Sequence, residues 1–376
     1  MPRILINQLV PAPQAARLND APAGLSLHPL GETAIGGDFL RVLELRFDAD
    51  LRAVAAEWLA DAAGAHASED LVLHTLAVHE ATPMARLVLQ GHPADALRPA
   101  LDTLHLAGLA ACTAGQSGQD LLEIPLAGGD PDWRLLNHQL LEAMVGVAAD
   151  VALCPAHWQA SHFGLFLSDM DSTLISIECI DELADMAGLK PQVSAITERA
   201  MQGELDFAAS LKARVALLKD LPASMLERVY TERLQLNPGA EALIQGLKAQ
   251  GCRLGVVSGG FTFFTERLKE YLGLDYAFAN ELEIQDGRLT GKVLGEIVDA
   301  QAKARILAQL ATELGLPLSR CIAVGDGAND LPMLKLAGLG VAYHAKPVVQ
   351  AQANYNIRHG GLDRILPLTR TSMAAY

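Results

Sequence analysis

Hydrophobic positions in the second half of the chain show two spacings, which predict an alternation of strands and helices. Short apolar runs predict buried strands at 163–168, 253–257, 321–324 and 339–342. Apolar residues that recur every three or four positions predict helices at 238–249, 261–272 and 299–314. An Asp-Gly pair between 281–285 and 288–292 indicates a hairpin. This order predicts a doubly wound, Rossmann-like parallel sheet.

A long stretch of purely helical spacing interrupts this alternation directly after its first strand. It covers about 176–237, and its apolar positions include Ile180, Leu183, Ala187, Phe207, Leu211 and Val215. Helical insertions next to a strand end often close over a site and shield it from water. We therefore expect a helical cap at about 176–237.

The N-terminal part has a different order of elements. From residue 84 the pattern predicts strands at 84–89, 109–113, 121–125 and 151–154, and helices at 95–106 and 132–145. This β-α-β-β-α-β order is the ferredoxin-like α+β arrangement. Before residue 84 the pattern is weaker and predicts an irregular segment at 12–29, strands at 39–47 and 71–78, and a helix at 50–63 with Asp50 as its N-cap.

The distribution of lysine indicates a domain boundary. The first 160 residues contain eight arginines and 19 acidic residues but no lysine, and the first lysine is Lys190. We therefore expect an α+β region at 1–157, ferredoxin-like over about 84–156, and an α/β domain at 158–376.

Composition argues against several classes of protein. Hydrophobic residues make up 51% of the 376 positions, as in a globular protein with a substantial core. The net charge of −15 argues against a nucleic-acid partner. No apolar run approaches the roughly 18 residues of a membrane helix, and the N-terminus lacks the layout of a signal peptide. The five cysteines are scattered, as reduced thiols are, so we expect a cytoplasmic protein.

Polar side chains follow the predicted strands of the α/β domain. Asp169 and Asp171 follow the first strand, Ser258 and Gly259 the second, and Asp326, Asn329 and Asp330 the third, while Lys303 lies in the helix before the third strand. The carboxyl ends of parallel strands are where ligands bind in such folds. Carboxylate oxygens are ligands that Mg²⁺ prefers, and a hydroxyl beside glycine N–H groups suits phosphate. Taken singly, the aspartates could form an acidic turn, and Lys303 could be a solvated surface residue.

Two aspartates one residue apart fit phosphoryl transfer. One carboxylate can attack phosphorus and form an aspartyl-phosphate. The other can protonate the leaving alkoxide and then deprotonate the attacking water. It must carry a proton at the first step, a state that neighbouring negative charge favours.

These motifs resemble those of a known superfamily. The set DxDxT from Asp169, then Ser258, Lys303 and GDGAND ending at Asp330, is similar to the haloacid-dehalogenase superfamily of phosphohydrolases. The stretches 169–178 and 201–215 resemble its phosphoserine phosphatase family. The resemblance implies Mg²⁺-dependent hydrolysis of O-phospho-L-serine to L-serine and phosphate, the last step of serine biosynthesis. The N-terminal region resembles the ACT-like extension of longer bacterial members.

The resemblance also implies a role for each matching catalytic position. Asp169 would be the nucleophile and a metal ligand. Asp171 would be the general acid and base and would offer its backbone carbonyl to the metal. Asp326 would complete the protein ligands of Mg²⁺, with Asp330 in support.

Substrate-binding roles follow in the same way. Ser258, Gly259 and Lys303 would hold the phosphate. Glu178 would bind the ammonium group of the substrate, and Arg214 would bind its carboxylate. Asn329 would lie near the substrate, and Phe207 and Met201 would help close the cap. A zwitterionic amino acid needs one anion and one cation, and arginine binds a carboxylate bidentately. Without the resemblance, Glu178 and Arg214 would be interpreted as surface helix charges.

Three functions are compatible with these residues. The first is hydrolysis of phosphoserine, and the second is transfer of its phosphoryl group to an acceptor alcohol such as homoserine. The third is a non-catalytic protein that senses serine or phosphoserine, against which the presence of both Asp169 and Asp171 argues. For the N-terminal region two roles are compatible with the sequence. It could be a ligand-binding regulatory domain, or a structural domain that could make the protein a homodimer.

Overall fold

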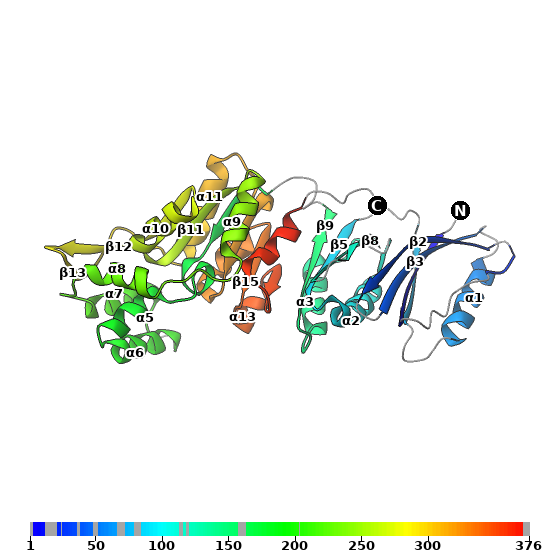
Figure 1. The fold of residues 1–376 in the computed structure, drawn as a ribbon, viewed down its shortest axis with the longest axis horizontal. Helices are drawn as coiled ribbons and strands as arrows, with labels where there is room; N and C mark the ends of the chain where they lie inside the picture. The colour runs from blue at the N-terminus through cyan, green and yellow to red at the C-terminus, as the bar shows by residue number, and fades with distance from the viewer. Residues whose placement is uncertain are drawn as a thin grey trace. The chain divides into compact units, whose positions relative to one another are not determined.

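The chain forms two compact units in the computed structural model (Figure 1), and each is described by itself. The structure describes residues 3–11, 21–23, 25–35, 38–47, 52–65, 72–78, 84–112, 116–117, 120–156, 163–202 and 204–370. The first unit comprises 1–161, 358–360 and 367–376, and the second comprises 162–357 and 361–366. Within the described ranges, no helix has both the length and the apolar character needed to cross a membrane.

The second half of the first unit has the ferredoxin-like order. Its elements are β5 (Ala85–Gly91), α2 (Pro93–Leu106), β6 (Leu109–Ala111), β7 (Gln116–Ser117), β8 (Leu121–Gly128), α3 (Trp133–Ala143) and β9 (Ala149–Pro155). The sheet order is β6-β8-β5-β9, and every pairing is antiparallel. The predicted ferredoxin-like α+β fold is therefore confirmed for this part.

The first half of the unit repeats this strand order. Its elements are β1 (Arg3–Pro11), β2 (Leu25–Ile35), β3 (Asp38–Phe47), α1 (Arg52–Ala65) and β4 (Val72–Val78). They form an antiparallel sheet of order β2-β3-β1-β4, so first, second, third and fourth strands occupy the same places in both sheets. The strands predicted at 39–47 and 71–78 are confirmed as β3 and β4. The proposed N-cap at Asp50 lies outside the described residues.

One prediction for this half is wrong. The segment 12–29 was expected to be irregular, but β2 begins at Leu25 and includes its last five residues. The register of β2 against β3 shifts between Pro29 and Gly31. Because proline and glycine at such an irregularity interrupt the alternation typical of a strand, the sequence pattern hides β2.

Buried polar contacts join the C-terminal segments of the chain to the first unit. The carboxylate of Asp150, at the start of β9, accepts hydrogen bonds from the backbone N–H groups of Arg358, His359 and Gly360 at 2.8, 3.3 and 3.2 Å. Arg86 in β5 donates to the carbonyl oxygen of Pro367 at 2.8 Å. The side chains of Asp150 and Arg86 are buried, and a buried polar group without a partner is costly. These hydrogen bonds therefore fix the C-terminal segments to the first unit.

The second unit is the predicted doubly wound α/β fold. Its strands are β10 (Leu165–Ser168), β11 (Arg253–Phe261), β12 (Tyr276–Gln285), β13 (Arg288–Leu294), β14 (Cys321–Gly325), β15 (Leu339–Tyr343) and β16 (Tyr355–Ile357). They form one sheet of order β13-β12-β11-β10-β14-β15-β16, in which all pairings are parallel except that of the β12–β13 hairpin. β10 is central, with β11 and β14 on either side, so the residues that follow these three strands meet at one edge.

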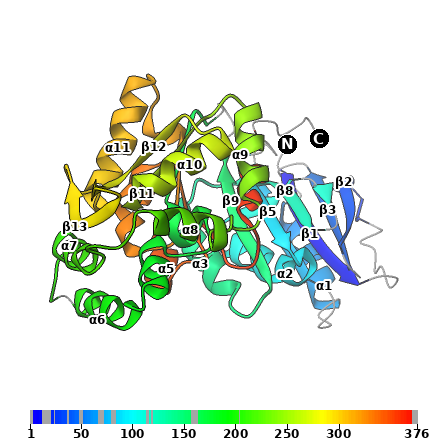
Figure 2. The ribbon, with the colours of Figure 1, turned by 60° about the vertical axis from the view of Figure 1, so that its left-hand side comes forward.

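Helices cover both faces of this sheet and form the cap. They are α5 (Cys179–Met186), α6 (Lys190–Met201), α7 (Phe207–Leu217), α8 (Ser224–Glu232), α9 (Ala240–Ala249), α10 (Thr262–Leu272), α11 (Ala300–Glu313), α12 (Leu331–Leu336) and α13 (Pro347–Gln350). Figures 1 and 2 show α5 to α8 gathered at one side of the unit, with the β12–β13 hairpin beside α7. The predicted helical cap is therefore present.

The base of the cap is closed by contacts between its two ends. Ile175 and Leu236 form an antiparallel bridge. The side-chain amide of Asn237 donates to the carbonyl oxygens of Thr173 and Ile175 at 2.8 and 3.0 Å. Both ends of the insertion are thereby anchored directly after β10, where Asp169 and Asp171 lie.

Candidate active site

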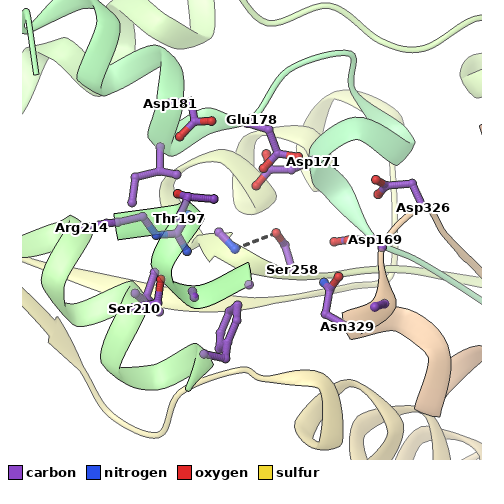
Figure 3. Close-up of a pocket in the computed structure, with 18 of the residues that line it drawn as sticks. Asp169, Asp171, Glu178, Asp181, Thr197, Ser210, Arg214, Ser258, Asp326 and Asn329 are labelled. Carbon is purple, nitrogen blue, oxygen red and sulfur yellow. Dashed lines mark hydrogen bonds between the residues drawn. The ribbon is translucent and has the colours of Figure 1, made fainter. Parts of the chain in front are cut away.

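A cavity of about 550 Å³ lies between the carboxyl edge of the sheet and the cap. The sheet contributes Asp169, Asp171, Ser258, Gly259, Asp326 and Asn329 to its lining. The cap contributes Glu178, Asp181, Thr197, Phe207, Ser210 and Arg214. Figure 3 shows these two groups facing each other across the cavity. Of the residues that the sequence singled out, Lys303 and Asp330 lie behind this lining.

A buried charge network lies under the cavity. The Nζ atom of Lys303 is 2.8 Å from Asp169 Oδ1 and 2.7 Å from Asp330 Oδ1. The three residues are only 1%, 5% and 0% exposed. The interpretation of Lys303 as a surface residue is therefore wrong. Burial of this cation is tolerated because two carboxylates contact it.

Helix capping places Lys303 in this network. The Asp299 carboxylate accepts a hydrogen bond from the backbone N–H of Ala302 at 2.8 Å and so caps α11. Lys303 follows within the first turn and faces the sheet. Burial alone lowers the pKa of Lys303, but Asp169 and Asp330 outweigh it and raise that pKa, so the ammonium group stays charged.

The acidic residues include a group that fits a divalent cation. Carboxylate oxygens of Asp169, Asp326 and Asp330 all lie within 4.8 Å of one another. Burial, and then the nearby Asp330, raise the pKa of Asp169 and raise that of Asp326 to about 6. Part of each shift comes from repulsion between neighbouring carboxylates, and hard oxygen donors are what Mg²⁺ and similar ions take. The carboxylate of Asp171 is not part of this group.

Asp171 occupies a different environment. Its Oδ1 accepts a hydrogen bond of 3.3 Å from the backbone N–H of Cys179, at the start of α5. Burial and the nearby Glu178 carboxylate raise the pKa of Asp171 to about 7. A substantial fraction of Asp171 therefore carries a proton near neutral pH, as a general acid must.

Residues 258–260, near the end of β11, form an irregular, glycine-rich stretch that we call the 258–260 turn. The register between β11 and β12 shifts between Val257 and Phe261, and the backbone N–H of Gly260 donates to Ser258 Oγ at 2.8 Å. A Cβ atom at Gly259 would lie 2.8 Å from Phe207 Cζ, and one at Gly260 would lie 2.8 Å from Asp171 Oδ2. Only glycine therefore leaves room for a ligand and for the cap.

A buried asparagine that the sequence reasoning missed supports this turn. Asn280 donates to the carbonyl oxygen of Gly259 at 2.8 Å and accepts from the backbone N–H of Val298 at 2.9 Å. It thereby links the turn to the segment that precedes α11 and Lys303. Asparagine is depleted in strands, so its position inside β12 was the available signal.

The cap brings opposite charges to the cavity. Glu178 and Arg214 both line it. Glu178 is exposed, as a surface charge would be, and is the N-cap residue of α5, whereas Arg214 is half-buried, so the interpretation as a surface charge is wrong for Arg214. Glu178 accepts a hydrogen bond of 2.7 Å from Ser172 Oγ. Burial lowers the pKa of Arg214, and the nearby Asp181 and Glu178 oppose that effect. Asp181 was also missed, although it follows Glu178 by three positions on one helix face.

The remaining predicted residues have the following positions. Phe207, at the start of α7, lines the cavity and covers Gly259, while Asn329 lines the opposite side. Met201 is the last residue of α6, and its side chain lies outside the described part of the chain. All five cysteines are buried and free, as their scatter predicted.

Comparison with known proteins places this site in a family. Residues 166–335 match the family of haloacid dehalogenase-like hydrolases. The chain is 52% identical over 215 residues to a phosphoserine phosphatase from Polaromonas sp., covering 56% of this chain and 91% of the relative.

Solved structures agree with this relation. A probable phosphoserine phosphatase from Vibrio cholerae superposes with a TM-score of 0.64 at 39% identity, covering 78% of this chain and 88% of the other. A phospho-aspartyl intermediate analogue of a phosphoserine phosphatase superposes with a TM-score of 0.53 at 46% identity, covering 56% of this chain and all of the other (100%). The chain therefore belongs to the haloacid dehalogenase-like hydrolases, in the family of the phosphoserine phosphatases.

Proposed function

We propose that the protein hydrolyses O-phospho-L-serine to L-serine and phosphate through an aspartyl-phosphate on Asp169. One observation carries this proposal. The sheet side of the cavity has carboxylates and a glycine-rich segment that suit a phosphate ester, and the cap side has both an acidic and a basic side chain. The relatives described above are named phosphoserine phosphatases, and these names support the same substrate.

The cap residues account for recognition of a zwitterion. Glu178, with Asp181 beside it, would bind the substrate ammonium group, and Arg214 would bind its carboxylate. Because the guanidinium group can donate two parallel hydrogen bonds, it holds a carboxylate in a defined orientation. Phe207 and Met201 would help close the cap, and Asn329 would contact the substrate from the sheet side.

Residues of the sheet edge account for the chemistry. Asp169 would attack phosphorus while Asp171, whose raised pKa of about 7 favours the protonated form, gives its proton to the seryl oxygen. Asp171 would then take a proton from the water that attacks the aspartyl-phosphate. Ser258, the N–H groups of Gly259 and Gly260, and Lys303 would hold the phosphate oxygens.

The acidic group fits Mg²⁺ as a cofactor. Asp169, Asp326 and the backbone carbonyl of Asp171 would hold the ion, with Asp330 supporting from behind through Lys303. When bound, Mg²⁺ supplies positive charge that neutralises the phosphate oxygens. The raised pKa values of Asp169 and Asp326 support this assignment, because a cation would relieve the repulsion among these carboxylates.

The rest of the chain is proposed to form a separate α+β region at 1–157, which is ACT-like over about 84–156. The absence of lysine from the first 160 residues supports the boundary. We also propose that the enzyme works in the cytoplasm, without a nucleic-acid or membrane partner, on its small-molecule substrate.

The proposal is tested by phosphate release from O-phospho-L-serine with and without Mg²⁺, beside phosphothreonine and p-nitrophenyl phosphate. We expect release that depends on Mg²⁺ and favours phosphoserine. Release from the aryl phosphate alone would overturn the roles of Glu178 and Arg214. Homoserine added as an acceptor distinguishes hydrolysis from transfer, because a transferase would yield phosphohomoserine instead of free phosphate.

A further inference from the structure

Ser210 is a buried serine whose side chain lines the cavity. It lies in α7, is 3% exposed and contributes to the cavity lining. Thr197 also lines the cavity, but its hydroxyl donates to the carbonyl oxygen of Val193 at 3.1 Å. The Ser210 hydroxyl therefore lies where it can donate a hydrogen bond to a ligand in the cavity.

Arg214 lies one helical turn later and has a donor without a partner. Its Nε atom is buried and has no hydrogen-bond partner in the described part of the chain. Ser210 and Arg214 are spaced i, i+4, which places their Cβ atoms about 5–6 Å apart on one helix face. Figure 3 shows both side chains on the same wall of the cavity. Together they present donors that could share one anion.

The direction of α7 indicates which group of the substrate Ser210 and Arg214 could bind. Phe207, the first residue of α7, contacts the Gly259 turn, where the phosphate is proposed to bind. Ser210 and Arg214 follow on the same face, about 4.5 and 10 Å further along the helix axis. Their donors therefore face the part of the substrate beyond its phosphate.

We propose that the Ser210 hydroxyl binds the substrate carboxylate together with Arg214, so that two donors from α7 select substrates with a carboxylate next to the ammonium group. This inference rests on the proposed function. A guanidinium and a hydroxyl one turn apart restrain two carboxylate oxygens, so they orient the seryl group as well as attract it. Glu178 and Asp181, on α5 and the residue before it, would receive the ammonium group from the other side.

The test compares O-phospho-L-serine with O-phosphoethanolamine, which has the same phosphate and ammonium groups but no carboxylate. We expect S210A to lower kcat/KM for phosphoserine about tenfold, mainly through KM, because it loses a hydrogen bond to a charged group. For phosphoethanolamine the loss should stay below about twofold, since that substrate has nothing for Ser210 to bind. S224A, a matched substitution at an exposed serine of α8, is the control for changes in the cap.

A second variant separates hydrogen bonding from packing. S210C keeps nearly the same volume but replaces the hydroxyl with a weak donor, so it should lose phosphoserine activity as S210A does. In an R214A background, S210A should cost much less than in the wild type, because both residues hold the same group. Wild-type selectivity in S210C, or equal losses by S210A on both substrates, would overturn the role of Ser210.

The same experiment distinguishes a wrong substrate from a wrong role for Ser210. If the wild-type enzyme does not prefer phosphoserine to phosphoethanolamine, the proposed substrate is wrong, whatever the variants do. If the wild type prefers phosphoserine and S210A keeps that preference, only the assignment of Ser210 is overturned.

Discussion

The floor and the roof of the cavity differ in how their polar groups are satisfied. The floor, defined as Asp169, Lys303, Asp330 and the 258–260 turn, is tied together by short contacts within the protein. The roof, defined as Glu178, Ser210 and Arg214, is less complete, because the buried Arg214 Nε has no partner in the described residues. Groups that are held in place before binding suit the reaction, whereas unpaired groups suit recognition of a particular substrate.

This difference predicts two classes of variant. Changes in the floor should lower activity towards every phosphate ester, because each ester presents the same phosphoryl group. Changes in the roof should alter the ratio between substrates, because only some esters carry an ammonium group and a carboxylate. Four variants, ordered from the largest expected effect, test this division.

Asp169→Asn should have the largest effect. The amide keeps the size of the side chain but cannot attack phosphorus, so turnover should fall below about 1% of wild type on phosphoserine and on p-nitrophenyl phosphate alike. Phosphate release measures the loss, and circular dichroism checks that the variant is folded. Residual activity above that level in a folded variant would move the nucleophile to another residue.

Lys303→Met should lower activity on both substrates by about 100- to 1000-fold, because it removes a buried cation at the phosphate site. It also leaves Asp169 and Asp330 without the ammonium group that they share, so the melting temperature should fall. Lys335→Met, at an exposed lysine of α12, is the matched control. A loss of activity on phosphoserine alone would mean that Lys303 recognises the substrate and does not act on the phosphate.

Arg214→Ala should act on one substrate only. We expect kcat/KM for phosphoserine to fall about 100-fold, since a charge-assisted contact to the carboxylate is lost. Hydrolysis of p-nitrophenyl phosphate should change by less than about threefold, as that substrate has no carboxylate. Arg228→Ala, in cap helix α8 and paired there with Glu232, controls for loss of a cap arginine. Equal losses on both substrates would mean that Arg214 binds phosphate or stabilises the cap.

Lys346→Gln should have the smallest effect, and only on the rate at which the enzyme binds its substrate. Among the described residues that line the cavity, Lys346 and Arg214 are cations, whereas Asp169, Asp171, Glu178, Asp181 and Asp326 are acidic. Loss of this exposed charge should lower kcat/KM about threefold at low ionic strength and leave kcat unchanged, since it weakens attraction of an anionic substrate.

Salt dependence and a second variant check this interpretation. The effect should disappear near 1 M salt, where the Debye length is about 3 Å. Lys335→Gln removes an exposed lysine away from the cavity and should change neither constant. A defect in Lys346→Gln that persists at high salt would indicate direct contact with the substrate instead of attraction at a distance.

Much of the floor could be predicted from the sequence. Apolar runs identified β10, β11 and β14, and parallel strands bring their carboxyl ends to one edge. Asp169, Ser258 and Asp326 were therefore expected to meet, and they do line one cavity. The short strand β16 and the bulged strand β2 were missed, because three residues or an interrupted alternation carry too weak a pattern.

The roof was harder to predict from residue patterns. Glu178 is the residue before α5, and Ser210 and Arg214 lie in α7, where charged and polar residues usually face solvent. Resemblance to a family drew attention to Glu178 and Arg214, but no pattern distinguished Ser210 from the other small residues of α7. Asn280 and Asp181 were missed for the same reason, because their importance depends on groups that are distant in the sequence.

The sequence by itself determined the order of elements, the positions of the catalytic aspartates at strand ends and the chemistry that those carboxylates can perform. These properties are local, since they depend on the spacing of apolar residues and on the side chains that follow each strand. Only the tertiary structure decided that Lys303 is buried between Asp169 and Asp330 and that Ser210 is buried in the wall of the cavity beside Arg214. The burial of a polar group and the partners available to it depend on packing between distant segments, which no local pattern records.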